Sequence, residues 1–134
     1  MTHLKEIKKA IIDKIKLIVP VVYGYEKGEM EKYPAAMIYS TEINPEWADT
    51  EQDKDIMVFK IGIYQEINNQ TPEKAEDLVD DVVVSIIEAF QQDWRIGKLV
   101  DKTTIRATKG WVSREVQTRA ATITITTTSL KKII

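Results

Sequence analysis

The sequence predicts an α+β domain: an antiparallel sheet of about four strands with two helices packed on one face, in the order α-β-β-α-β-β. Two stretches repeat apolar residues at intervals of three and four, as amphipathic helices do. Other stretches alternate between two kinds of residue, as half-buried strands do, most clearly RAATITITTTS at 119–129. Because strands joined by short connections pair antiparallel and each helix has a single apolar stripe, both helices are expected on the same face of the sheet.

One domain is expected over residues 1–134, a length that suits a single hydrophobic core. Hydrophobic residues make up 43% and charged residues 30%, which argues against wholesale disorder. No apolar run approaches the about 20 residues of a membrane-spanning helix, and lysines interrupt the N-terminal apolar residues, so we expect no membrane segment and no signal peptide. These features indicate a cytoplasmic protein. The absence of cysteine excludes disulfides and thiolate chemistry.

The first predicted element is an amphipathic helix over residues 3–18, which Pro20 ends. Its apolar residues recur at helical spacing: Leu4, Ile7, Ile11, Ile15 and Ile18. Lysines occupy its outer face.

The second helix begins at Thr71, a good N-cap, with Pro72 at the first helical position and Gly97 as a C-terminal stop. Its apolar stripe is broad and consists of Ala75, Leu78, Val79, Val82, Val83, Ile86, Ile87 and Phe90. The opposite side is acidic and contains a single stray apolar residue, Val84, which in a ring-forming protein would be placed to meet a neighbour.

Two predicted strands lie between the helices. After a glycine-containing turn and Pro34, the sequence predicts a strand from about Ala35 to Ile43. The polar stretch NPEWADTEQDKD follows, either as a loop or as a protruding hairpin tip, and the next strand spans residues 56–67. One face of this second strand is clearly apolar.

A β-hairpin is predicted at the C-terminal end. A short strand around Thr103 to Thr108 leads to a turn, either at Lys109-Gly110 or in residues 113–117, and then to the threonine-rich strand. In that strand Thr122, Thr124 and Thr126 alternate with isoleucines, so they belong on the face without helices. Such a face can be solvated or can meet another subunit.

Charge is sorted along the chain, although the net charge is only −2. Five lysines oppose two acids in residues 1–25, whereas three lysines oppose nine acids in residues 26–55. One lysine opposes seven acids in residues 72–94, and nine basic residues oppose two acids in residues 95–134. These segments either form solvated faces of separate elements or supply opposed surfaces for head-to-tail contacts between identical subunits.

No catalytic, cofactor or metal site is expected, and the chain is not expected to be an enzyme. The only histidine, His3, lies near the N-terminus, which leaves none for a catalytic triad or a zinc cluster in the body of the fold. Acidic residues alternate in one loop at Glu26, Glu29 and Glu31, without a second cluster that would complete a catalytic pair. Asp77, Asp80 and Asp81 fit a solvated helix face better than a cation site.

Basic and aromatic residues gather in the last hairpin: Arg106, Lys109, Trp111, Arg114 and Arg119. This pattern is compatible with contacts to a nucleic-acid backbone. The isoelectric point near 5.5 and the two acidic segments argue against direct, tight binding of nucleic acid. Trp47 and Trp111 lie in polar stretches of the sequence. Each is therefore expected either to pack against the protein's own core or to insert into a partner.

The sequence of elements resembles the tail terminator proteins of long-tailed bacteriophages. The likeness covers nearly the whole chain and consists of a lysine-rich amphipathic helix, YPAAMIYSTE, an acid-rich loop before DIMVFKIGIYQE, TPEKAEDLVDDVVVSIIEAF, and a final RAATITITTT strand. It is a likeness of pattern and length without an invariant catalytic motif.

The resemblance implies a homo-oligomeric ring, usually a hexamer, in the tail and neck of the virion. Such a ring is assembled in the bacterial cytoplasm, caps the tail tube, and docks the head-tail connector protein. DNA would pass through it without specific binding. We therefore expect acids of one of the two acidic segments to line the hole, with Glu26, Glu29, Glu31, Asp80 and Asp81 as candidates. Candidates for contacts with other subunits or partners are Trp47, Val84, Trp111, Arg114, Arg119, Thr122, Thr124 and Thr126.

Three alternatives remain open. Another neck or head-tail joining protein would share the size and the ring. A small non-catalytic binding module would be monomeric. A small enzyme would need a pocket lined by several perturbed carboxylates.

Overall fold

The fold is α+β, as the sequence predicts, with two helices and five strands among the residues that the structure describes. The computed structural model describes residues 2–24, 35–47, 52–66, 72–112 and 118–132. The elements in chain order are α1 (Thr2–Lys16), β1 (Val21–Tyr23), β2 (Ala35–Trp47), β3 (Gln52–Glu66), α2 (Pro72–Gln92), β4 (Lys102–Val112) and β5 (Thr118–Lys132).

The sheet has five strands in the order β1-β2-β3-β5-β4 and is mixed, which corrects the expectation of about four antiparallel strands. The pairs β2–β3, β3–β5 and β4–β5 are antiparallel, whereas β1 pairs parallel with β2, Val21 opposite Ala35. The element order is therefore α-β-β-β-α-β-β. Strand β1 is only three residues long, too short for an alternating pattern to be visible in the sequence.

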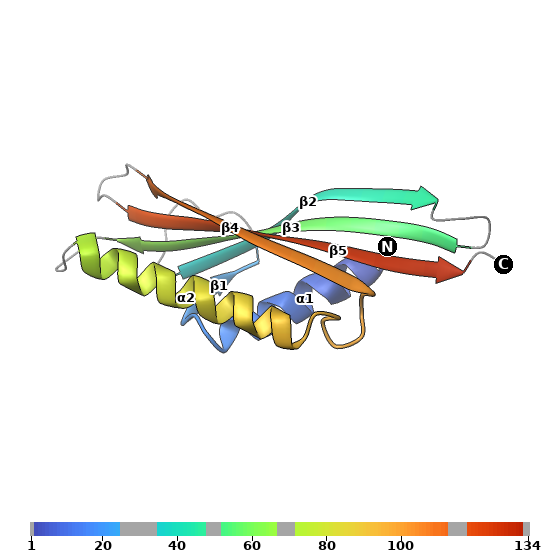
Figure 1. The fold of residues 1–134 in the computed structure, drawn as a ribbon, viewed down its shortest axis with the longest axis horizontal. Helices are drawn as coiled ribbons and strands as arrows, with labels where there is room; N and C mark the ends of the chain where they lie inside the picture. Colours follow the sequence, from blue (N-terminus) through green and yellow to red (C-terminus); the bar gives the residue numbers. More distant parts are fainter. Residues whose placement is uncertain (1, 25–34, 48–51, 67–71, 113–117, 133–134) are drawn as a thin grey trace.

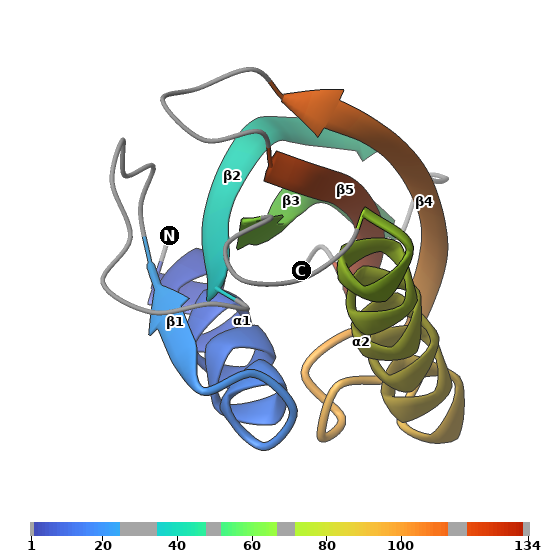
Figure 2. The ribbon, with the colours of Figure 1, turned by 90° about the vertical axis from the view of Figure 1, so that its left-hand side faces the viewer.

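Both helices lie on the same side of the sheet, as Figures 1 and 2 show. Helix α1 packs near β1 and β2, and α2 packs beneath β3, β5 and β4. The core fills the space between these layers, and its central cross-strand row joins Ile38, Ile61 and Ile123, all fully buried. Helix α1 contributes Ile7, Ile11 and Ile15, and α2 contributes Val79, Val82, Val83, Ile86 and Phe90.

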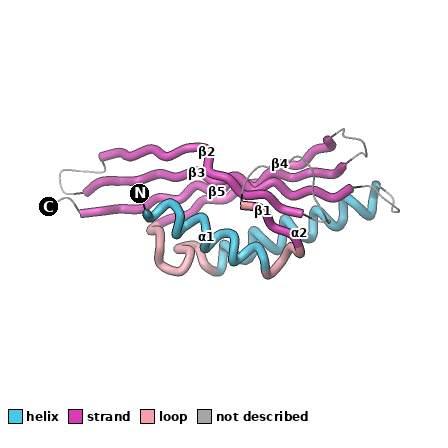
Figure 3. The backbone as a smooth tube through the Cα atoms, turned by 180° about the vertical axis from the view of Figure 1, so that it is seen from behind, coloured by secondary structure: helices cyan, strands magenta, loops and turns pink. Residues whose placement is uncertain are grey.

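The strands are longer than the sequence pattern indicates. Strands β2 and β3 remain paired as far as Trp47 and Asp53, so most of the stretch predicted as a loop or hairpin tip belongs to the hairpin. This hairpin and the end of β5 extend past the helices (Figures 1 and 3). Alternation was a poor guide here because the residues of this stretch, NPEWADTEQDKD, are mostly polar.

The C-terminal hairpin contains no turn at Lys109-Gly110, since both residues pair within β4 with Ala121 and Ala120. The prediction of a turn at that dipeptide is therefore wrong. The alternative, residues 113–117, lies outside the described residues.

Helix α2 is followed by three successive residues in the left-handed region: Ile96, Gly97 and Lys98, with φ of 49°, 62° and 68°. The backbone N–H of Gly97 donates to the carboxylate of Asp93 at 3.0 Å. Helix α2 ends at Gln92, so Gly97 lies in the loop five residues further on and is not, as the sequence predicted, the residue at which the helix stops. Among these three residues only Gly97 adopts the left-handed backbone without steric cost.

Gly97→Ala is expected to lower the free energy of unfolding by about 1 kcal/mol, because a Cβ disfavours the left-handed backbone. An added Cβ would meet no atom within 4 Å, so the loss would come from the backbone alone. Chemical denaturation would measure it. Gly110→Ala is the matched control, since its Cβ also meets nothing within 4 Å and its φ is not positive. Equal stability of Gly97→Ala and wild type would contradict the expectation.

Candidate interaction surfaces

The face of the sheet away from the helices carries the predicted threonine row. Thr122, Thr124 and Thr126 are half-buried there, while the intervening Ile123 and Ile125 are completely buried against the helices. The sequence alternation therefore assigned each side of β5 correctly. No described helix covers this open face.

Two cations flank the threonine row. In the cross-strand register Thr124 lies between Lys60 of β3 and Arg106 of β4. A shallow hollow beside it is lined by Thr104, Ile105, Arg106, Thr124 and Thr126. With hydroxyls and two positive charges, this part of the open face suits a polar partner with negative groups better than an apolar one. The register, rather than any motif, places Lys60 and Arg106 on either side of Thr124.

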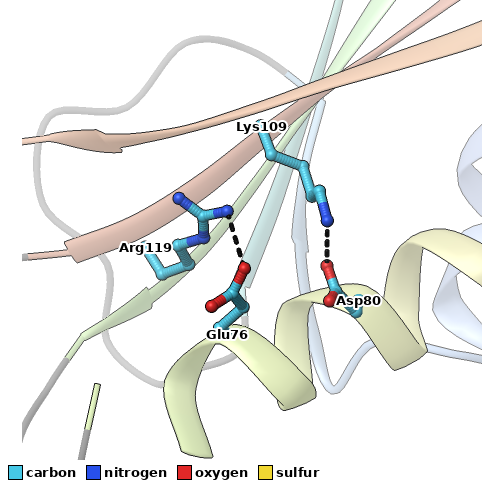
Figure 4. A network of polar contacts seen from close by, with 4 residues as sticks. All are labelled: Glu76, Asp80, Lys109 and Arg119. Carbon is cyan, nitrogen blue, oxygen red and sulfur yellow. Dashed lines mark hydrogen bonds and ion pairs between the residues drawn. The ribbon is translucent and has the colours of Figure 1, made fainter. Parts of the chain in front are cut away.

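The acidic helix α2 and the basic C-terminal hairpin meet within the chain (Figure 4). Arg119 Nη2 lies 3.2 Å from Glu76 Oε1, and Lys109 Nζ lies 2.8 Å from Asp80 Oδ1. Arg119, a candidate for contacts between subunits, is buried in this intramolecular pair. Asp80, a candidate for the lumen, is likewise held by Lys109. Some of the negative charge of α2 is thus neutralised by basic residues of the same molecule. The sequence did not show this, because the paired residues are far apart along the chain.

The remaining acids of α2 stay at the surface. Glu73, Asp77, Asp81 and Glu88 are exposed, and Val84 among them is 52% exposed. The sequence placed Val84 correctly on the acidic side of the helix. An apolar side chain in such a position loses contact with water when another surface covers it.

Several candidates lie wholly or partly outside the described residues. Glu26, Glu29, Glu31 and Arg114 lie outside the described residues. Trp47 ends β2 and Trp111 lies in β4 opposite Arg119, but their side chains are also outside the described part of the chain.

A groove between the C-terminal ends of the two helices was not predicted. Its walls include Lys14, Leu17, Ile18, Ala89 and Asp93. Leu17 is 87% exposed, and Trp94, just after α2, is 51% exposed with the Arg95 guanidinium 6.0 Å from its ring centre. The signal in the sequence was Leu17, which departs from the helical period of the isoleucines around it.

Asp93 holds the end of α2 and the end of α1 together. Its carboxylate accepts the Gly97 N–H and lies 3.1 Å from Lys14 Nζ. The Gly97 hydrogen bond is the main cause that lowers the pKa of Asp93; desolvation opposes it, and Lys14 adds to the lowering. The ionised form is therefore favoured in the folded protein.

Asp93→Asn is expected to lower the free energy of unfolding near pH 7 by about 0.5–1 kcal/mol, a small value because the carboxylate is partly exposed. A folded pKa below the unfolded value gives stability that is present above the unfolded pKa and is lost as the pH falls through the folded pKa. The two proteins should therefore converge in strong acid. Urea denaturation from pH 7 to pH 2 measures this, and a constant difference across that range would contradict it.

The sequence matches no protein-family model and no curated protein.

The described residues contain neither a cluster of metal ligands nor a membrane-spanning helix. No group of three or more histidine, cysteine, aspartate or glutamate side chains there could hold a metal ion. No helix in the same ranges is long and apolar enough to cross a membrane.

Proposed function

We propose that the protein is a tail terminator of a long-tailed bacteriophage, a virion structural protein whose ring caps the tail tube and provides the docking surface for the head. The proposal rests on the sequence resemblance, whose segments fall in α1, β2, β3, α2 and β5. The observation that carries it is the one-sided layer: helices on one face, and a threonine face left without a helix on the other. This arrangement offers large surfaces for assembly.

In the proposed ring the helix layer faces the hole and the open sheet face meets a partner. Asp81 and Glu88 are exposed on the helix layer, where their negative charge would repel the phosphates of passing DNA. Thr122, Thr124 and Thr126, with Lys60 and Arg106 around Thr124, would contact the tail-tube protein or the connector. Six subunits are the number that the resemblance implies.

The test is capping of tail tubes assembled from the tube protein encoded in the same genome. Purified protein should appear by electron microscopy at one end of each tube and should stop elongation. Thr124→Tyr should reduce capping, because a bulky aromatic side chain on the open face obstructs docking. The isoleucine core beneath should stay intact. Lys98→Ala, an exposed residue of the loop after α2, is the control and should cap normally.

Two outcomes would overturn the proposal. Binding to the connector with no affinity for tube ends would assign the chain to another neck component. Tubes that elongate equally with and without the protein would remove the terminator function. Neighbouring reading frames for a portal, a capsid protein and a tape-measure protein are the expected genomic context.

A further inference from the structure

Helix α1 has a basic outer flank, defined here as Lys5, Lys9, Ile12 and Lys16. The helical period places these residues on the side of α1 that turns toward β1 and away from α2. Two contacts fix that direction: Lys8 Nζ donates to the Gly24 carbonyl at 2.6 Å, and Ile12 lies beside Gly24. The three lysines are exposed and Ile12 is partly buried.

The two acids of α1 do not cancel this flank. By the same period Glu6 and Asp13 are displaced toward the side of α1 that carries Ala10 and Lys14, which line the groove beside α2. Lys9 does contact Asp13 at 3.2 Å, but both side chains are more than half exposed, and such i,i+4 pairs are weak. Among the described residues, lysine is therefore the only charged residue type on the outer flank of α1.

Helix α2 has an acidic outer flank, defined here as Glu73, Asp77, Asp80 and Val84. It turns toward β4, because Asp80 contacts Lys109 of that strand and Glu76, next to the flank, contacts Arg119 of β5. Glu73 and Asp77 are exposed, and neither forms an ion pair with a basic residue within the described part of the chain. Val84 adds an exposed apolar side chain to this flank.

The two outer flanks lie at opposite sides of the molecule, so they cannot meet within one chain. Figure 2 shows α1 and β1 on one side of the helix layer and α2 and β4 on the other. A second copy placed beside the first in a similar orientation brings its α1 flank to the α2 flank of its neighbour. Opposite charges then surround an apolar pair, Val84 and Ile12.

We propose that copies of this chain associate head to tail, with the basic outer flank of α1 in one copy on the acidic outer flank of α2 in the next. The contact is heterologous, because each copy uses two different surfaces, and repetition of such a contact generates a ring when the rotation closes. The association itself stands on the flanks described above. Only its closure into a ring of defined size rests on the proposed function.

The contact should depend on salt. Its charges are exposed, and the Debye length falls from about 30 Å at 0.01 M to about 10 Å at 0.1 M ionic strength. Self-association should therefore weaken steadily as salt is added, whereas a contact made by apolar surface alone would hold or strengthen.

Reversal of charge on either flank tests the proposal. One variant carries Glu73→Lys and Asp77→Lys, the other Lys5→Glu and Lys9→Glu. Each should associate at least about tenfold more weakly than wild type in sedimentation velocity at low salt, because like charges then face each other. Thermal melts confirm that each variant is folded. Lys98→Glu with Lys102→Glu, away from both flanks, is the control with the same charge change as the variant that carries Lys5→Glu and Lys9→Glu.

Mixing the two variants is the decisive measurement. In an equimolar mixture every junction again joins opposite charges, since each copy of one variant has two basic flanks and each copy of the other has two acidic flanks. Assembly should return, with the variants in a 1:1 ratio. A single chain that carries all four reversals should also assemble. A contact that pairs like flanks would give the opposite pattern: either reversal alone would still place like charges face to face and change little, and the mixture would associate more strongly than the wild type.

Because the chain has no native cysteine, crosslinking gives a second readout. Lys9→Cys with Val84→Cys in one chain should form a ladder of disulfide-linked oligomers under oxidation, and either cysteine alone should stop at the dimer. Lys98→Cys with Val84→Cys is the control and should give no ladder beyond dimers.

The inference and the proposed function can fail separately. A wild type that remains monomeric at low salt, or reversals that leave its association unchanged, would overturn the inference whatever happens at tube ends. Normal self-association that fails to cap tubes would overturn the terminator function and leave the inference standing.

Discussion

Replacement of Ile123 by alanine is expected to lower the free energy of unfolding by about 2–5 kcal/mol, whereas Thr124→Ala on the same strand should change it by less than about 0.5 kcal/mol. Ile123 is fully buried at the centre of the sheet, beside Ile61 and Ala107 in the cross-strand register. Its loss leaves a cavity between the sheet and the helices. Thr124 is half-buried on the open face, where water fills the space that its methyl and hydroxyl groups leave.

This pair of variants tests the one-sided layer directly. Urea denaturation with a constant m-value would give both differences in the same experiment. Phe59→Ala, on the same side of the sheet in β3 and also fully buried, extends the comparison and should cost about 3–5 kcal/mol. If Thr124→Ala were as destabilising as Ile123→Ala, the threonine face would be packed rather than open, and the proposed docking surface would be lost.

The sequence predicted best those elements whose residues face the core. Helix α2 begins at Pro72 as expected, and the residues of β5 alternate between faces as expected. In both cases burial against the same core imposes a period on the sequence. Leu78 is the exception: it fits the apolar stripe of α2 by spacing, yet it is 38% exposed at the margin of that stripe.

Elements outside the core were predicted less well. Strand β1 is held by parallel pairing with β2 over three residues, and backbone pairing leaves no pattern in the sequence. The far ends of β2 and β3 were assigned to a polar loop or a protruding hairpin tip, because their residues are mostly polar; the structure shows paired strands that extend past the helices. The ion pairs between α2 and the C-terminal hairpin join residues 29 and 43 positions apart, and only the fold brings them together.

These ion pairs connect the core to the proposed contact between subunits. They tie the N-terminal half of α2 to β4 and β5, and the acidic outer flank occupies the same half of the helix. A shift of α2 would move Glu73 and Asp77 relative to the edge of the sheet. The internal pairs would therefore position the flank, of which Asp80 is itself a member.

Arg119→Ala is expected to lower the free energy of unfolding by about 2–3 kcal/mol, well above the effect of Lys109→Ala, which should be less than about 1 kcal/mol. The Arg119 side chain is 10% exposed, so its loss removes packed methylene groups as well as the pair with Glu76. Lys109 and Asp80 are each about two-fifths exposed, and water largely replaces their contact.

Double-mutant cycles separate these contributions. The coupling between Arg119 and Glu76 should be about 1 kcal/mol, because Glu76 is 45% exposed and its charge is partly hydrated. The coupling between Lys109 and Asp80 should be smaller and should disappear in 1 M salt, where the Debye length is about 3 Å. Equal couplings for the two pairs, both lost in salt, would show that burial of Arg119 does not strengthen its ion pair. Helix α2 would then be held by its apolar stripe alone, and its acidic flank would have no electrostatic anchor on the hairpin.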